Sequence, residues 1–484
     1  MFTASRVRLL VVTCAALFMA MLDNLVLGVA LPAIQQSFHA TMSDLEWFMN
    51  AYTLAFSVLL IPFSLLGERI GRKRMFLAGV VLFTLGSALS GLSTSSIALI
   101  LSRALQGIGG AAVVPLSLTL VNAAFPADKR AAALGIWSGI SGLGLSVGPL
   151  VGGLIVEGAP WQLIFWVNVP VGVIAFLLGL KWLDESRGER RPIRISSVLL
   201  VAGGLFGLVF GLERGNAEGW GSAPVLLSLL GGAALLVLFY VWERARRLPL
   251  IRFDLFRNRQ YSALVLTGFW MNAGIFCAIF LLTLFLQQAQ GYSALGAGIR
   301  EMAWTGCTMI AAPLAGLAVS RFGTRSVLSA GLLLQAVAIA GFAVLILTVG
   351  VDFPFGYQAP MMMAAGAGMG LSFTPLSHGI LSSAPDGASG EASGVSNATR
   401  ELGGVFGIAI GGLIFQSGAA VRTPADFGDH IVPSLFAGSA MIALALIGVL
   451  LFVRGPGRKP APGTAANPTN PAAAAAPLHA ETAG

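Results

Sequence analysis

Two ionisable residues lie deep inside apolar stretches of the chain. Asp23 is the only acid well inside the stretch 9–31, about two-thirds of the way along it, and Arg103 lies about six residues, ~9 Å, inside the stretch 97–121. An ionisable group held away from water costs several kcal/mol unless it is paired or faces a water-filled space, so such groups mark functional sites. Burial favours a neutral carboxyl and a nearby Arg favours an ionised one, so the two residues together are suited to proton exchange. A static ion pair that joins two helices is the alternative.

An uncharged stretch from 131 to 156 combines regularly spaced small residues with a proline. These residues are Gly144, Gly148, Pro149, Gly152 and Gly153. Glycines four positions apart form a smooth stripe on one helix face, against which another backbone can pack closely. Proline removes a hydrogen-bond donor and bends the helix. The pattern predicts a bent and tightly packed helix, and ordinary small-residue packing explains it equally well.

The composition is that of a membrane protein. Of 484 residues, 56% are hydrophobic and 10% are charged, and the mean hydropathy is +0.83, which a soluble domain of this length does not tolerate. A membrane-spanning helix needs about 20 apolar residues. Fourteen stretches qualify: 9–31, 47–66, 75–93, 97–121, 131–156, 161–182, 195–213, 223–243, 260–285, 297–319, 326–349, 355–382, 395–418 and 432–453. We therefore expect an all-α integral membrane protein with both ends on one side.

The positive charges indicate which side that is. Most of the 29 Lys and Arg residues fall in loops on the side of the N-terminus, whereas Arg214 and Arg422 fall on the other side. Because cytoplasmic loops are enriched in cations, both termini are predicted to be cytoplasmic. The net charge of +8 reflects this topology and gives no reason to expect nucleic-acid binding. The three cysteines fall within spans and show no metal or disulfide spacing.

The chain also repeats itself. Segment 64–74 and segment 316–325 each follow a predicted span, and at an offset of 252 Arg69 matches Arg321, Gly71 matches Gly323 and Lys73 matches Arg325. Two six-helix halves with a site at their interface are typical of transporters that alternate access by rocking. The predicted division is an N-terminal half at 1–182, a two-helix insert with its flanking cytoplasmic loops at 183–259, a C-terminal half at 260–454 and a disordered cytoplasmic tail at 455–484.

Six motifs together carry a resemblance to a known family. They occupy 22–32, 64–74, 99–110, 144–153, 161–170 and 394–404. In order and spacing they resemble the major facilitator superfamily, and specifically its fourteen-helix drug/proton antiporter branch. The chain departs from the pattern at Ser64 and Glu68, at Gln162-Leu163, and at Glu401, where the family usually has Gln.

The resemblance assigns roles to several residues. It implies proton coupling by Asp23 and Arg103, and an antiporter motif in 144–153. From the glycine stripe of that motif we expect the helix to pack tightly against the opposite half and to seal one end of a central cavity. A gate at the cytoplasmic face is expected from Glu68, Arg69, Gly71, Arg72 and Arg74, although positive-inside topology also explains the cations. In the span 395–418 the motif residues are Asn397, Arg400 and Glu401. Arg400 and Glu401 are adjacent and so are not expected to face each other; coupling and packing remain open for them.

Further polar and aromatic residues are candidates for the cavity wall. They are Asn24, Trp137, Trp270, Asn272 and Phe276, for which packing is the alternative. His378 is the only histidine inside a predicted span, and a hydrogen bond to a neighbouring helix accounts for it more simply than proton transport.

The sequence lacks the motifs that would let the chain drive transport by ATP hydrolysis. No lysine follows a glycine, so no phosphate-binding GxxxxGK[ST] loop is present, and no metal-ligand cluster or nucleophile–base arrangement occurs. We therefore predict no enzyme and no cofactor, but a proton-coupled antiporter that exports amphipathic drugs, dyes or antibiotics across a bacterial plasma membrane. Its expected partners are the small substrate, protons and the lipid bilayer, with no nucleic acid, and the expected state is a monomer. The alternatives are an exporter or importer dedicated to one metabolite, and less readily a channel or a transporter-derived sensor.

Overall fold

The computed structural model describes residues 3–187, 194–246, 249, 251, 253–384, 389–417 and 421–453, and within these ranges it contains helices and no strand. The first seven helices are α1 (Ala4–Phe38), α2 (Met42–Ile70), α3 (Arg72–Gly91), α4 (Ser96–Ala124), α5 (Ala127–Gly158), α6 (Leu163–Trp166) and α7 (Asn168–Trp182). Next come α8 (Ile195–Glu218) and α9 (Ala223–Arg244), then the 3-10 turn η1 (Phe253–Arg257). The last group is α10 (Arg259–Leu284) with the π turn η2 (Phe285–Ala289), α11 (Ala294–Phe322), α12 (Thr324–Val349), α13 (Phe355–Ser383), α14 (Ser389–Phe415) and α15 (Pro424–Phe452).

The predicted number of crossings is confirmed. Within the described residues, 13 helices are long and apolar enough to span a membrane, with α6 and α7 counted as one crossing. The further crossing is α13, which has 29 residues and is richer in Gly, Ser and Met. Fourteen crossings place the start of α1 and the end of α15 at the same end of the bundle, which we name the termini end; the α1–α2 turn lies at the far end.

The helices extend beyond the predicted spans because their capping residues are polar. Helix α2 begins at Met42 rather than near 47, since Thr41 and Asp44 form a capping box that satisfies the first backbone N–H groups. Helix α15 begins at Pro424 rather than 432, with a capping box between Thr423 and Asp426. It therefore contains His430, so the expectation that His378 is the only histidine in a span is wrong.

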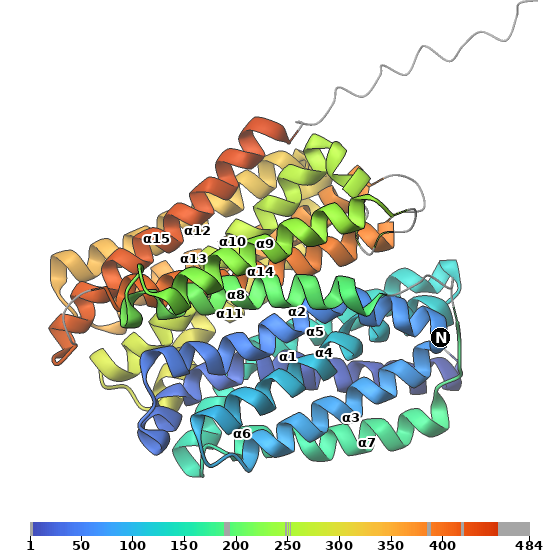
Figure 1. The fold of residues 1–484 in the computed structure, drawn as a ribbon, viewed down its shortest axis with the longest axis horizontal. Coiled ribbons are helices and arrows are strands. Elements are labelled where there is room, and N and C mark those ends of the chain that lie inside the picture. Colours follow the sequence, from blue (N-terminus) through green and yellow to red (C-terminus); the bar gives the residue numbers. More distant parts are fainter. Residues whose placement is uncertain are drawn as a thin grey trace, which may run out of the picture.

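The helices form two sets with an insert between them (Figure 1). Helices α1–α7 contact one another, as do α10–α15, and the sets meet where α5 contacts α11 and α2 contacts α14. Helices α8 and α9 pack together, and α8 lies against both α2 and α14. Many large apolar side chains on the outside are exposed, among them Leu227 and Leu317, as suits contact with lipid. The division at 182/183 and 259/260 remains our proposal, and the predicted tail at 455–484 lies outside the described residues.

The internal repeat extends to backbone geometry and contacts. Gly71 between α2 and α3 has φ 131°, and Gly323 between α11 and α12 has φ 81°, values that favour glycine. Two residues after each glycine, a cation binds the last turn of a helix in its own set. Lys73 donates to the carbonyl of Leu180 at 2.9 Å, and Arg325 donates to that of Leu450 at 2.6 Å. Such matching contacts indicate that the two sets are built on one plan.

Candidate functional site

Asp23 lies in the middle of α1 with no exposed surface, and three donors surround its carboxylate. Nη1 of Arg103 on α4 donates to Oδ2 at 2.5 Å. Nε2 of Gln106 and Nδ2 of Asn168, on α4 and α7, donate to Oδ1 at 2.8 and 2.9 Å. Groups on α4 and α7 thus hold the buried carboxyl of α1, and a buried polar group is stable only if it is paired and hydrogen-bonded.

Arg103 is equally buried, with 1% of its surface exposed. Its Nε donates to the carbonyl of Phe48 on α2 at 3.2 Å, and its Nη1 also donates to Gln106. The guanidinium lies 4.5 Å from the centre of the Tyr52 ring. Asp23 and Arg103, which lie at similar depths in their predicted spans, therefore do form an ion pair, and this pair links α1, α2 and α4. This geometry fits a static ion pair between helices and also a pair that couples proton movement to transport.

A cavity of about 2330 Å³ lies between the two sets of helices. Its wall includes Tyr52 but neither Asp23 nor Arg103, so the tyrosine ring stands between the cavity and the ion pair. The wall reaches Glu68 and Arg72 at the termini end and ends near Ile279 and other apolar residues within the bundle. The buried pair thus borders a chamber that extends to the termini end.

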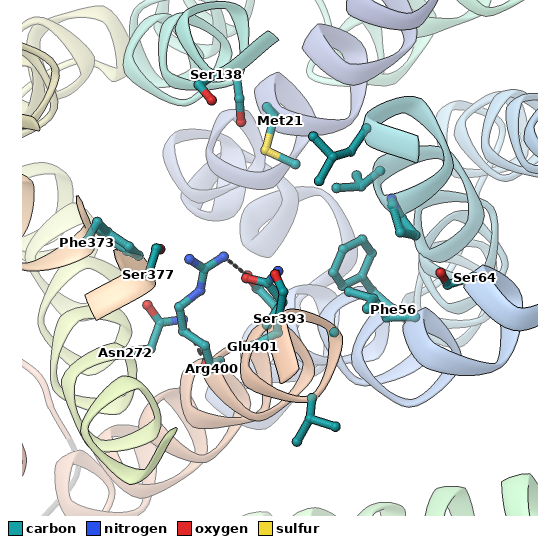
Figure 2. A pocket seen from close by; sticks show the side chains of 18 of the residues that line it. Met21, Phe56, Ser64, Ser138, Asn272, Phe373, Ser377, Ser393, Arg400 and Glu401 are labelled. Atoms are coloured by element: carbon teal, nitrogen blue, oxygen red, sulfur yellow. Dashed lines mark hydrogen bonds and ion pairs between the residues drawn. The ribbon is translucent and has the colours of Figure 1, made fainter. Parts of the chain in front are cut away.

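Arg400 and Glu401 project into this cavity from α14 (Figure 2). Nη2 of Arg400 lies 3.0 Å from Oε1 of Glu401, and its guanidinium is 5.0 Å from the centre of the Phe373 ring. The expectation that these neighbours do not face each other is wrong, because the long Arg side chain folds back to reach the adjacent carboxyl. Asn397, one turn earlier, also lines the cavity.

Most of the predicted wall residues do line the cavity. Asn24, Trp137, Asn272 and Phe276 belong to its wall. Trp270 does not: it packs edge-on against Phe269 and against the main apolar core. The reason is helical periodicity, since two residues of rotation place positions 270 and 272 on opposite faces of α10.

The turn between α2 and α3 is held from within its own set of helices. Arg72 Nη2 pairs with Glu68 Oε2 at 2.6 Å. The carboxylate of Glu185, which follows α7, accepts from the backbone N–H groups of Lys73 and Arg74 and so caps the start of α3. Of the predicted gate residues, Glu68 and Arg72 line the cavity, Arg69 and Arg74 are exposed, and Gly71 lies against Glu185.

The far end of the bundle is closed by contacts between the two sets. Ser293 Oγ and the N–H of Leu295 on the C-terminal side both donate to Glu157 of α5, at 2.7 and 3.1 Å. Gln287 donates to the carbonyl of Val29 on α1 at 3.0 Å. The cavity is therefore blocked here, while its other end reaches the turn at Glu68.

The glycine stripe of α5 serves two different contacts. A Cβ added at Gly144, Gly148 or Gly152 would meet residues of α1, from Phe18 to Val26. Only Gly153 meets the other set, with Ala294 O and Leu295 Cα each 2.7 Å from an added Cβ, and the neighbouring Pro149 carbonyl lies against Gly298. The expectation that the whole stripe packs against the opposite half is thus wrong for three glycines, whose spacing of four residues follows the α1 face.

The other set of helices contains a matching glycine stripe, which explains the contacts of Gly144, Gly148 and Gly152 with α1. Gly403, Gly407 and Gly411 of α14 lie against α10 in the same manner, along Phe269, Ala273 and Cys277. Close packing of the fifth helix of a set on the first is therefore a property of the shared plan. The part of the motif specific to closure is Gly153 with Pro149.

Several buried polar residues were not predicted. Gln106 and Asn168 complete the shell of Asp23; Gln106 lies one helical turn after Arg103, a spacing that could have indicated it.

His378 donates to or accepts from Thr324 at 3.2 Å on an exposed surface, as a simple hydrogen bond between helices. In the part of the chain that the structure describes, no group of three or more His, Cys, Asp or Glu side chains could hold a metal ion.

Comparison with known proteins identifies the family. The model of the Major Facilitator Superfamily matches residues 13–408. The tetracenomycin C resistance and export protein of Streptomyces glaucescens is 34% identical over 88% of this chain and 78% of its own length. The multidrug resistance protein Stp of Mycobacterium tuberculosis is 34% identical over 84% of this chain and 75% of its own.

Solved structures agree on the fold. The xylose transporter XylE of E. coli, in a partially occluded inward-open conformation, superimposes with a TM-score of 0.62 over 94% of this chain and 99% of its own at 15% identity. The nucleoside transporter NupG gives 0.64 over 93% and 100% at 12% identity. The chain therefore belongs to the major facilitator superfamily, as a multi-pass transporter of the bacterial plasma membrane.

Proposed function

We propose that this protein is a proton-coupled antiporter that exports amphipathic small molecules of the antibiotic or dye type by alternating access. The observation that carries the proposal is the fully buried Asp23–Arg103 pair beside a large cavity that is closed at one end. A carboxyl in that position can take up and release one proton as its access to water changes.

The charge distribution supports the direction of transport. Arg72, Arg244 and Arg257 border the cavity at the termini end, and most cations of the chain fall on that side. Because cytoplasmic loops are enriched in Lys and Arg, this end is assigned to the cytoplasm. The conformation is then inward-open, which is the state that collects substrate from the cytoplasm for export.

The shell of Asp23 suggests how a proton acts on the helices. Ionised Asp23 accepts from Arg103, Gln106 and Asn168, whereas a neutral carboxyl loses its attraction for the guanidinium. Arg103 also holds the carbonyl of Phe48, one turn before Tyr52 on α2. Protonation therefore loosens the joint between α1, α4 and α2, next to the tyrosine that a substrate in the cavity would touch.

The cavity wall supports an amphipathic substrate. Apolar groups such as Phe56, Phe276 and Met369 supply most of the surface, and the Arg400–Glu401 pair supplies charges of both signs. Aromatic or aliphatic bodies can bind the former, while a cationic or anionic group can exchange places with one member of the pair. A single chain encloses the cavity, which supports a functional monomer.

A dedicated exporter of one compound is the second candidate, since one relative is named for tetracenomycin C and another, from Bacillus subtilis, for methylenomycin A resistance. Cationic, neutral and anionic lipophiles offered in parallel to the reconstituted protein distinguish the two. Accumulation of several classes supports a multidrug exporter, whereas accumulation of one compound alone supports the dedicated form.

Transport driven by an imposed pH gradient tests the proposal itself. Proteoliposomes with the wild-type protein should accumulate substrate against its gradient, and Asp23→Asn should abolish accumulation while retaining downhill exchange. Asp429→Asn makes the same chemical change at an exposed position of α15 and serves as the control. Accumulation by correctly folded Asp23→Asn at the wild-type rate would overturn the assignment of the coupling residue.

A further inference from the structure

Two more buried acids meet where the two sets of helices join the insert. Glu46 of α2 is fully buried and Glu213 of α8 is 3% exposed. Glu46 Oε1 accepts from Nε2 of Gln416, just after α14, at 2.7 Å. Glu213 Oε1 accepts from Nδ2 of Asn50 of α2 at 2.9 Å. The cluster therefore ties together three helices, one from each set and one from the insert (Figure 1).

This cluster has acceptors in excess of donors. Oε2 of Glu46, Oε2 of Glu213 and Oδ1 of Asn50 are buried and have no hydrogen-bond partner. Asn50 lies one helical turn after Glu46 on α2 and binds Glu213, so the two carboxyls lie along the same face of that helix. Apolar residues of the same three helices, among them Leu54 and Val405, form one buried cluster. Two carboxylates in such surroundings cannot both remain ionised without a counter-charge, so the site requires at least one proton or cation.

No described side chain on the surrounding helices supplies that counter-charge. Among the described residues, no Lys, Arg or His forms an ion pair with Glu46 or Glu213. Arg214, next to Glu213 on α8, is turned towards Glu218 at 2.7 Å and the Phe210 ring. His430 of α15 is engaged with the carbonyl of Phe415 at 2.6 Å.

The remaining charged groups of the packed helices lie elsewhere. Asp44 on α2 is partly exposed and is occupied with its capping box. The described charged residues of α14 are Glu391, Arg400 and Glu401, and all three line the central cavity instead. The oxygens are also too few for Ca²⁺, because two carboxyls and one amide fall short of the 6–8 oxygens that this ion prefers.

The cluster is also part of the closure at the far end. The carboxyl of Glu46 lies directly against the backbone of Gly412 on α14, in the space that a side chain there would fill. Separation of α2 from α14 breaks this contact and the bond to Gln416, and admits water to the carboxyl from the far side. Glu46 and Asn50 occupy one face of α2, while Phe48 and Tyr52 on another face contact Arg103. The two acid sites therefore share the same two turns of one helix.

We propose that Glu46 and Glu213 form a second proton-binding site, which holds a proton while the far end is closed and exchanges it with the outer side when α2 and α14 separate. In this step the O–H bond of one carboxylic acid breaks, the proton passes to water, and the carboxylate left behind is hydrated. The role of this site in transport rests on the proposed antiport, whereas its protonation can be measured without any transport. The insert thereby gains a role, since α8 supplies half of the site.

Infrared difference spectroscopy of the reconstituted protein tests protonation without any transport. A buried carboxylic acid shows a C=O stretch apart from the amide and carboxylate bands. At neutral pH this band should be present in the wild type, reduced in Glu46→Gln and in Glu213→Gln, and unchanged in the exposed control Glu218→Gln. Gly412→Ala, which displaces the Glu46 carboxyl while retaining it, should shift the band and thus covers the case in which a Gln variant fails to fold.

Counting protons per substrate then tests the part in transport. Glu46→Gln should still export substrate but move about one proton fewer per molecule, whereas Asp23→Asn should lose all coupling. A band that persists in both Gln variants would overturn the proposal, as would a band that vanishes when Na⁺ replaces K⁺ at constant pH, since that result assigns the site to a cation. If the wild-type protein shows the band but moves no protons during transport, the proton-binding site is supported and the proposed antiport is refuted.

Discussion

Replacing Gly153 by leucine should open the far end of the bundle. In the closed arrangement a Cβ at this position lies 2.7 Å from the carbonyl oxygen of Ala294 and 2.7 Å from Cα of Leu295, both on α11. Neither backbone atom can rotate away as the tip of a flexible side chain can. Relief therefore requires that α5 and α11 move apart, which is the movement that opening needs.

The magnitude follows from the kind of contact. Forcing extra methylene groups into a packed interface costs typically ~1–3 kcal/mol. This penalty falls on the closed state alone, since the two helices separate when the far end opens. A difference of that size corresponds to a shift of about 5- to 150-fold in the ratio of open to closed molecules.

Gly148→Leu is the matched control. An added Cβ at Gly148 would lie 3.2 Å from both Leu22 O and Leu25 Cβ, which belong to α1 in the same set of helices. The strain there exists whether the far end is open or closed. This variant should therefore unfold at a lower temperature without a change in the conformational ratio.

Distances between spin labels at the far end measure the ratio. Ser37→Cys in the last turn of α1 and Asp352→Cys before α13 are exposed positions on opposite sets, and Cys14, Cys277 and Cys307 are removed first. Double electron–electron resonance should show a longer-distance population that grows in Gly153→Leu and stays at the wild-type level in Gly148→Leu. Equal distributions in all three proteins would refute the assignment of Gly153 to the closure.

Three further substitutions test other parts of the site. Arg103→Ala removes the cation beside Asp23, so substrate-induced proton release, followed with a pH indicator dye, should be lost or move to higher pH; an unchanged release profile would separate the two residues. Tyr52→Leu removes the ring between the cavity and the pair, and proteoliposomes should then leak protons without substrate, a result that a purely packing role of Tyr52 excludes. Gly71→Ala places a Cβ at φ 131° against the Glu185 carboxylate, so the melting temperature should fall, and an unchanged value would contradict the described turn.

The fold was largely predictable because hydropathy and the repeat both depend on short-range patterns. Runs of apolar residues locate each crossing, and the offset between Gly71 and Gly323 locates the two sets. Helix ends were predicted less well, since polar caps such as Thr41 and Thr423 extend helices beyond the apolar run.

The site was predictable only in part, because short-range patterns reveal some of its residues but not the long-range contacts between them. Asp23 and Arg103 stand out because they interrupt apolar runs at similar depth. Glu46 and Glu213 lie at the edges of the predicted spans 47–66 and 195–213, where an acid is ordinarily read as a loop residue. That they meet depends on how α8 packs between α2 and α14, a long-range contact that no local pattern encodes.

Proton movement coupled to substrate movement tests the central proposal most directly. Wild-type proteoliposomes with a substrate gradient and no initial pH gradient should move protons opposite to the substrate, and an internal pH dye records their direction and number. We expect this counter-movement in the wild type and its loss in Asp23→Asn, while the exposed control Asp429→Asn should retain it. Substrate flux without any proton movement in the wild type, or equal proton movement in Asp23→Asn, would contradict it.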